Sequence, residues 1–160
     1  MSNRRIVTPE MARGVAKACL CLHVQRAARA LARHFDDVFR PMGLTSGQFS
    51  LLMSLNRPAP TIGETAAFLA MDRTTLTAML KPLERRKLVA VKPDPEDRRS
   101  RRLELTPAGR AVLAKAYPVW CETHGEIEAM VSPSGAGPMR NELTRLVKVL
   151  ERSNGFDPRI

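Results

Sequence analysis

The chain has 160 residues, of which 44% are hydrophobic and only 4% aromatic, and its formal net charge is +10. No apolar stretch approaches the roughly 20 residues that cross a bilayer, no apolar signal segment follows the first arginines, and three cysteines without regular spacing exclude a disulfide framework. We therefore expect a cytoplasmic protein with no membrane contact, whose excess of positive charge predicts a polyanionic partner such as nucleic acid.

The first predicted element is a helix over residues 8–40. Thr8 is a candidate N-cap, Pro9 occupies a first-turn position that needs no backbone N–H, and apolar residues then recur with helical period as far as Phe39. A helix of that length spans about 45 Å, which is more than a small lobe can bury. We interpret its N-terminal half as a dimerisation element.

Three short helices are expected next. Thr45 and Thr61 each stand three residues before a Gln or Glu, the pattern of a capping box, and each is followed by an apolar run. Asp72 caps a third helix that runs to about Lys87. The close spacing of the last two helices is typical of a helix-turn-helix motif.

The helix from Arg73 onward has two distinct faces. Leu76, Leu80 and Leu83 fall on one side, whereas the opposite side is small, hydroxyl-bearing and positive, which suits close approach to phosphates and base edges. Pro82 is expected to bend or fray the last turns. The candidate DNA contacts on this helix are Arg73, Thr74, Thr75, Thr77, Lys81 and Arg85.

Two segments rich in branched and apolar residues, 88–92 and 102–105, flank a loop of charged residues and prolines. Because Pro93 and Pro95 oppose ladder bonding, this pattern predicts a β-hairpin whose tip projects into solvent, a wing. A guanidinium is planar, always charged and weakly hydrated, which suits a narrow, negatively charged groove. We expect phosphate contacts from Arg98, Arg101 and Arg102.

After the wing, Thr106 and Pro107 repeat the cap-then-proline opening and predict a connecting helix over 107–131, with a kink at Pro118. Small residues and prolines then interrupt the chain, and a final amphipathic helix is expected over 135–152. The expected architecture is thus one domain of 1–160, mainly helical with a small hairpin. Its parts are dimerisation helices at 8–40 and 135–152 and a winged helix-turn-helix lobe at 45–106.

The order of these elements, together with Asp94-Pro95-Glu96-Asp97-Arg98-Arg99 and Leu105-Thr106-Pro107-Ala108-Gly109, resembles the MarR family of bacterial transcription regulators over nearly the whole chain. The resemblance implies a winged-helix homodimer that binds a pseudo-palindromic DNA operator and is released by a small ligand or by oxidation. It also implies that Asp97 holds Arg99 for the minor groove. Lys87 stands where the family often has glycine, so it must adopt a left-handed conformation or end the helix differently.

The candidate ligand or sensor residues are Cys21, His23, Phe39, Phe49 and Met53. In the peroxide-sensing branch of the family, tyrosines support the reactive cysteine of the first helix, but Gln25 and Phe35 occupy those positions here. His23 and Arg26 could still lower the pKa of a nearby thiol. A regulator that senses peroxide through Cys21 therefore stands as an alternative to one released by a small ligand.

No metal, cofactor or enzymatic activity is expected. The three histidines lack ligand spacing, and no nucleophile, base and orienting group occur together. A further alternative is a winged helix that binds RNA or protein. RNA readers usually offer stacking aromatic residues, which are scarce here, so double-stranded DNA is the preferred partner.

Overall fold

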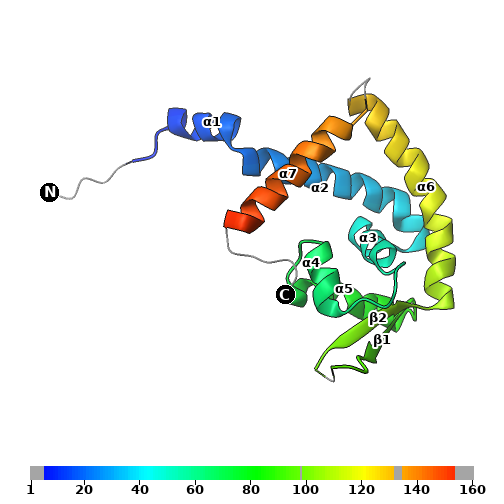
Figure 1. Ribbon diagram of the computed structural model, residues 1–160. Helices are drawn as coiled ribbons and strands as arrows, with labels where there is room; N and C mark the ends of the chain where they lie inside the picture. The colour runs from blue at the N-terminus through cyan, green and yellow to red at the C-terminus, as the bar shows by residue number, and fades with distance from the viewer. Residues whose placement is uncertain (1–5, 98, 132–134, 154–160) are drawn as a thin grey trace.

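The computed structural model describes residues 6–97, 99–131 and 135–153 and shows a helical protein with one β-hairpin (Figure 1). Its elements are α1 (Pro9–Ala18), α2 (Leu20–Phe39), the 3-10 helix η1 (Arg40–Met42), α3 (Ser46–Ser54), α4 (Ile62–Phe68), α5 (Arg73–Arg85), β1 (Val89–Pro93), β2 (Arg101–Leu105), α6 (Pro107–Val131) and α7 (Gly137–Ser153). The expected fold class is confirmed. None of the helices in the described parts is long and apolar enough to span a membrane.

The single helix expected over residues 8–40 is wrong, because the chain breaks at Cys19. Thr8 caps α1 as expected, but Cys19 is extended at ψ 102°, and its N–H closes α1 on the carbonyl of Val15 at 2.8 Å. Its Sγ then accepts the N–H of Leu22 at 3.4 Å and so caps α2. Because only one residue is extended, the helical spacing of apolar residues in the sequence is almost the same on both sides of the break. The sequence pattern therefore gives no sign of it. Helix α1 buries none of its residues and projects from the body (Figure 1).

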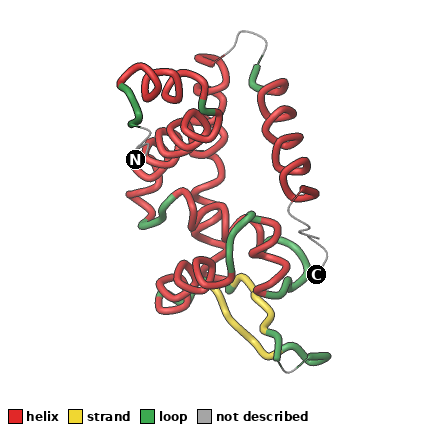
Figure 2. Tube along the Cα trace, turned by 90° about the vertical axis from the view of Figure 1, so that its left-hand side faces the viewer, coloured by secondary structure: helices red, strands yellow, loops and turns green. Residues whose placement is uncertain are grey.

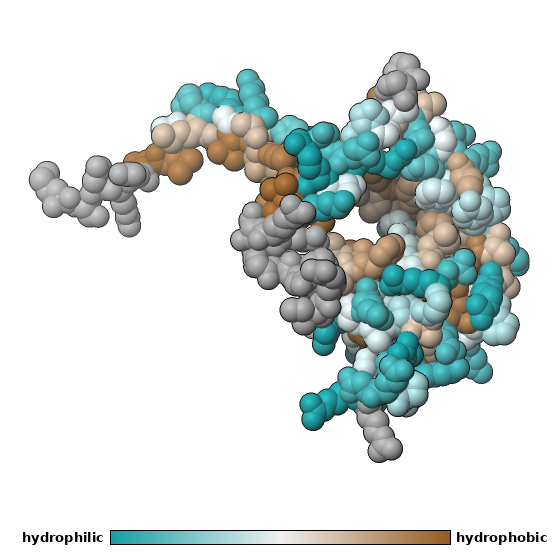
Figure 3. All heavy atoms as spheres, in the orientation of Figure 1, coloured by the Kyte–Doolittle hydropathy of each residue, from teal (hydrophilic) through white to brown (hydrophobic). Residues whose placement is uncertain are grey.

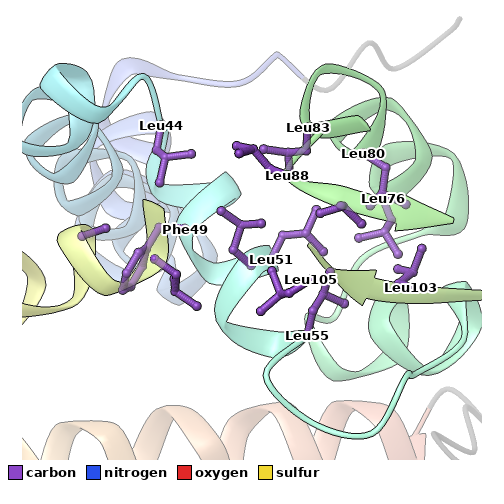
Figure 4. Packing of buried hydrophobic residues seen from close by; sticks show 14 of the residues in the cluster. Leu44, Phe49, Leu51, Leu55, Leu76, Leu80, Leu83, Leu88, Leu103 and Leu105 are labelled. Carbon is purple, nitrogen blue, oxygen red and sulfur yellow. The ribbon is translucent and has the colours of Figure 1, made fainter. Parts of the chain in front are cut away.

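The lobe is built on an aliphatic core, as the scarcity of aromatic residues predicts. The end of α2, then α3, α5, the hairpin and the start of α6 all contribute to it (Figure 4). The side chains with at most 2% exposure include Phe39, Leu51, Leu52, Leu76, Leu80, Leu83 and Leu103. Burying one such side chain contributes about 1.5–3 kcal/mol. Three of these leucines belong to α5, so the core fixes that helix and directs its other face outward.

Side-chain caps begin the helices of the lobe, as predicted. The N–H of Gln48 donates to Thr45 Oγ1 at 3.2 Å and that of Glu64 to Thr61 Oγ1 at 3.1 Å, and both capping boxes are complete. Asp72 accepts from the N–H of Thr75 at 2.8 Å. The fraying expected at Pro82 is not seen, because α5 continues to Arg85.

The hairpin is antiparallel and pairs Val89 with Leu105 and Pro93 with Arg101. Both strands reach one residue nearer to the tip than the sequence pattern predicts. Pro93 is tolerated in β1 because β1 is an edge strand. The other edge of β2 contacts the segment before α4, where the N–H of Leu103 donates to Pro60 O at 2.8 Å. The base of the wing is therefore tied to the helix-turn-helix.

Helices α6 and α7 leave the lobe and turn back. Helix α6 runs without interruption through Pro118, and α7 stands apart from the other helices in Figure 2. Five large apolar side chains of α7 are exposed, those of Met139, Leu143, Val147, Val149 and Leu150. Figure 3 shows apolar side chains gathered along α1 as well. The terminal helices thus present apolar surface that the lobe does not cover.

Candidate nucleic-acid interface

Helix α5 presents the expected face to solvent. Leu76, Leu80 and Leu83 are buried in the core. The exposed side chains of α5 are those of Arg73, Thr74, Thr75, Thr77, Ala78, Lys81, Glu84 and Arg85. The structure therefore brings all six candidate contacts of this helix to its solvent side, where no carboxylate follows Asp72 until Glu84.

Two of the threonine hydroxyls on this helix already donate within the protein. Thr75 Oγ1 donates to Asp72 Oδ2 at 2.6 Å, and Thr77 Oγ1 donates to the carbonyl of Arg73 at 2.7 Å. The bonds from Thr75 lower the pKa of the Asp72 carboxyl. Both hydroxyls can still accept a hydrogen bond, but neither has a proton to spare in this arrangement.

Asp97 organises the wing tip through the backbone rather than through a side-chain pair. Its Oδ1 accepts the N–H of Arg99 at 3.0 Å, and its carbonyl accepts the N–H of Ser100 at 2.9 Å. The side chains of Arg99 and Arg101 are exposed, whereas Arg98 lies outside the described residues. The aspartate therefore fixes the turn from which the arginine side chains extend.

A largely buried aspartate of the wing, Asp94, forms an ion pair with Arg102. Asp94 is 5% exposed, and its Oδ2 lies 3.0 Å from Arg102 Nε, while its Oδ1 accepts the N–H of Glu96 at 3.0 Å. Arg102 Nη1 donates to the carbonyl of Ala59 at 3.2 Å. We call Asp94, Arg102 and Ala59 the wing clasp. The Glu96 N–H, followed by the charge of Arg102, lowers the pKa of Asp94.

The wing clasp changes the expectation for Arg102. This side chain was expected to contact phosphate, yet its guanidinium is engaged by Asp94 and by the segment before α4. The hairpin register explains the partner: Asp94 lies opposite Ser100, so Arg102, two residues farther along β2, projects to the same face. Arg102 therefore anchors the wing.

Replacing Arg102 with alanine is expected to loosen the wing, because Asp94 then loses its partner. If the loosened wing is correctly placed about a third of the time, DNA affinity falls about threefold at neutral pH. The pKa of Asp94 is lowered in the folded protein, so the clasp stabilises above the unfolded-state pKa and is lost as pH falls through the folded-state value. Urea unfolding of both proteins should show a stability difference at neutral pH that shrinks on acidification. A difference independent of pH would contradict this role.

Arg57 is a basic residue near the wing base that sequence reasoning missed. Its guanidinium carbon lies 4.8 Å from the centroid of the exposed Phe68 ring. It lines a cavity of about 410 Å³ together with Glu64 and Arg102. A single arginine in a loop carries no sequence signal, and only the packing of the loop against α4 reveals its position.

The ligand candidates separate into two groups. Phe39, at 1% exposure, stacks on Phe49 with ring centroids 4.6 Å apart, and Phe49 stacks in turn on Trp120. Phe49 and Met53 line a cavity of about 450 Å³ between α3, α4 and α6, together with Ser50, Ser54, Phe68, Leu69 and Trp120. The structure thus places Phe49 and Met53 at one cavity and buries Phe39 behind it.

Cys21 and His23 lie at the start of α2, apart from this cavity. Cys21 is exposed, and its Sγ accepts from Gln25 Nε2 at 3.1 Å. His23 Nδ1 lies 2.9 Å from the carbonyl of Cys19. Across residues 6–97, 99–131 and 135–153, no group of three His, Cys, Asp or Glu side chains could hold a metal ion.

Comparison with known proteins agrees with this geometry. The MarR family model matches residues 44–100. The transcriptional regulator MosR of M. tuberculosis, in complex with DNA, is 38% identical with a TM-score of 0.77, over 84% of this chain and 98% of that chain. The transcriptional repressor CouR, bound to a 23-mer DNA duplex, is 31% identical with a TM-score of 0.69, over 86% and 96% of the chains. The transcriptional activatory protein BadR of Rhodopseudomonas palustris is 28% identical, over 98% of this chain and 92% of BadR. The chain therefore belongs to the MarR family of transcriptional regulators.

Proposed function

We propose that the protein is a homodimeric repressor that binds a pseudo-palindromic DNA operator in the cytoplasm and is released by a small ligand. The observation that carries this proposal is the exposed, carboxylate-poor face of α5 beside a basic wing. In this proposal the protein binds DNA and catalyses no reaction. The DNA complexes of MosR and CouR support double-stranded DNA as the partner.

Each element of the interface has its own part in this proposal. Helix α5 enters the major groove, where Thr74, Lys81 and Arg85 lie on the face that meets base edges and phosphates. Arg99 enters the flanking minor groove from the wing. Phosphate contacts come from Arg73, Arg98 and Arg101. Thr75 and Thr77, whose hydroxyls can still accept, face hydrogen-bond donors on the base edges. Asp97 and Arg102 hold the wing in place.

Dimerisation is proposed through the terminal helices. The apolar side chains exposed before and within α1 are those of Ile6, Val7, Met11 and Val15, each at 60% or more. Helix α7 adds a second exposed apolar stripe. Soluble monomers rarely expose contiguous apolar surface on this scale. A dimer that covers it can hold two recognition helices about 34 Å apart, the repeat of successive major grooves.

The cavity lined by Phe49, Met53 and Trp120 is the proposed effector site. Its volume of about 450 Å³ lies within the range that small-molecule sites occupy, and its lining of aromatic and aliphatic side chains favours a largely apolar ligand. Because the cavity lies between α6 and the helix-turn-helix, a ligand that prefers one arrangement of these elements shifts the population toward it. A ligand that prefers the arrangement unable to bind DNA releases the operator.

A gel-shift titration with duplex DNA from upstream of the gene, against RNA of equal length, tests the proposal. We expect preferential binding of the duplex, with an affinity that falls with salt at a slope of about −0.9 per phosphate neutralised. Equal affinity for the RNA would overturn it. In vitro transcription from the same promoter separates repression from activation. Release by hydrogen peroxide that Cys21→Ser abolishes would replace the small ligand with oxidation.

A further inference from the structure

The first residue after the recognition helix reaches across the lobe to the end of α2. Arg86 is the C-cap of α5, and its guanidinium Nη2 donates to the carbonyl of Met42 at 3.1 Å. Its Nη1 donates to the carbonyl of Gly43. The planar guanidinium of one arginine therefore donates hydrogen bonds to two successive carbonyls, which lie more than 40 residues earlier in the chain.

The backbone at Gly43 is shaped to receive this side chain. Gly43 adopts a left-handed conformation with φ 64°, which closes η1 through its own N–H to Arg40 O at 2.9 Å. A Cβ added at Gly43 would lie 3.2 Å from Arg86 Nη2. The guanidinium thus occupies the space that a side chain would need. Carbonyls at a helix C-terminus carry partial negative charge, which favours a cation there.

On its other side, Arg86 adjoins the turn that leads from the recognition helix into the wing. Lys87 takes the left-handed conformation with φ 57°, which is one of the two alternatives expected for this position. The N–H of Leu88 then donates to Leu83 O at 2.9 Å, and β1 follows at once. Any movement of Arg86 therefore moves both the end of α5 and the start of β1.

An exposed arginine at this position could instead act only as one more positive charge near DNA. Two features of this contact argue otherwise. The charge is directed at backbone carbonyls on the α2 side, not at the exposed face of α5. The partner position is a glycine with positive φ, where a larger side chain would displace the guanidinium.

We propose that Arg86 is a positioning residue for operator recognition. It fixes α5 and the wing against the end of α2, the helix that leads to the dimerisation surface. In the dimer it thereby sets the separation and angle at which two recognition helices meet DNA. This inference rests on the proposed dimeric binding of an operator.

The test measures affinity for a set of operators whose half-sites are moved apart or together by one base pair. One base pair changes the separation by about 3.4 Å and the rotation by about 35°. We expect the wild-type protein to lose more than tenfold in affinity for either shifted operator. Arg86→Ala should bind the unshifted operator about fivefold more weakly yet lose less than threefold on shifting, because its helices are no longer held at one spacing.

Two further variants make the result decisive. Arg85→Ala removes the same charge from the neighbouring exposed position, and we expect weaker binding with an unchanged dependence on spacing. Arg86→Lys keeps the charge but has a single donor nitrogen, and its dependence on spacing should fall between those of the wild type and Arg86→Ala. If Arg86→Ala does not fold, as judged by circular dichroism, the lysine variant decides. A wild-type spacing profile in the variant tested overturns the inference, whereas failure of the wild-type protein to bind any of the operators overturns the proposed function.

Discussion

Replacing Arg99 with alanine is expected to weaken operator binding by more than tenfold while leaving the dimer intact. A well-placed arginine contact contributes about 1–3 kcal/mol, which corresponds to roughly 5–150-fold in affinity. Asp97 holds the turn through the backbone N–H of Arg99, so the tip keeps its shape when the side chain is removed. The loss then reports the guanidinium itself, measured by fluorescence anisotropy on a labelled operator.

Lys115→Ala is the matched control, because this exposed lysine on α6 carries the same charge and lies outside the proposed interface. It should change affinity little. Asp97→Ala should reproduce part of the Arg99 effect, since the turn loses its acceptor. Unchanged affinity in Arg99→Ala would remove the minor-groove contact of the wing from the mechanism.

Replacing Gly109 with alanine is expected to destabilise the protein by about 3 kcal/mol or more, because of overpacking. Gly109 lies in the first turn of α6, and a Cβ there would lie 2.0 Å from the carbonyl oxygen of Leu88. The neighbouring contacts hold that carbonyl in place: the N–H of Thr106 donates to it at 3.1 Å, and Thr106 Oγ1 also donates to Lys87 O at 2.7 Å. The gain of about 1 kcal/mol in helix propensity is too small to compensate.

Gly125→Ala in the same helix should instead stabilise the protein. No atom lies within 4 Å of a Cβ at that position, so only the propensity gain of about 0.5–1 kcal/mol remains. Urea unfolding of the three proteins at equal concentration measures both effects, since the stability of a dimer depends on concentration. Similar stability of Gly109→Ala and the wild type would show that the start of α6 can move away from Leu88 at no cost in free energy.

Local chemistry is what the sequence predicts well here. The helix caps at Thr45, Thr61 and Asp72 each join residues three positions apart, so both residues of each cap can be recognised in the sequence. The left-handed Lys87 is one of the two alternatives expected at a position where glycine is usual in the family. The buried face of α5 follows from its period. Each of these features is decided within one or two helical turns.

Contacts between distant segments escape the same reasoning. Asp94 and Arg102 meet only because the hairpin register places them on one face, and Arg86 meets Gly43 only because the lobe folds. The break at Cys19 depends on a weak thiol cap, which is not a common helix signal. For the wing, the family resemblance implied that Asp97 holds Arg99, and the structure shows that the bond from Asp97 runs to the backbone N–H of Arg99.

The stacking of Trp120 gives the protein a built-in optical reporter. The chain has one tryptophan, and its ring stacks on His124 at 4.7 Å between centroids while lining the cavity with Phe49 and Met53. Indole emission depends on the polarity of its surroundings and on quenching by neighbouring groups. Indole emission from this chain, excited above the tyrosine absorption band, therefore comes from a single residue at the proposed effector site. Its change on titration can follow occupancy of that cavity without any label.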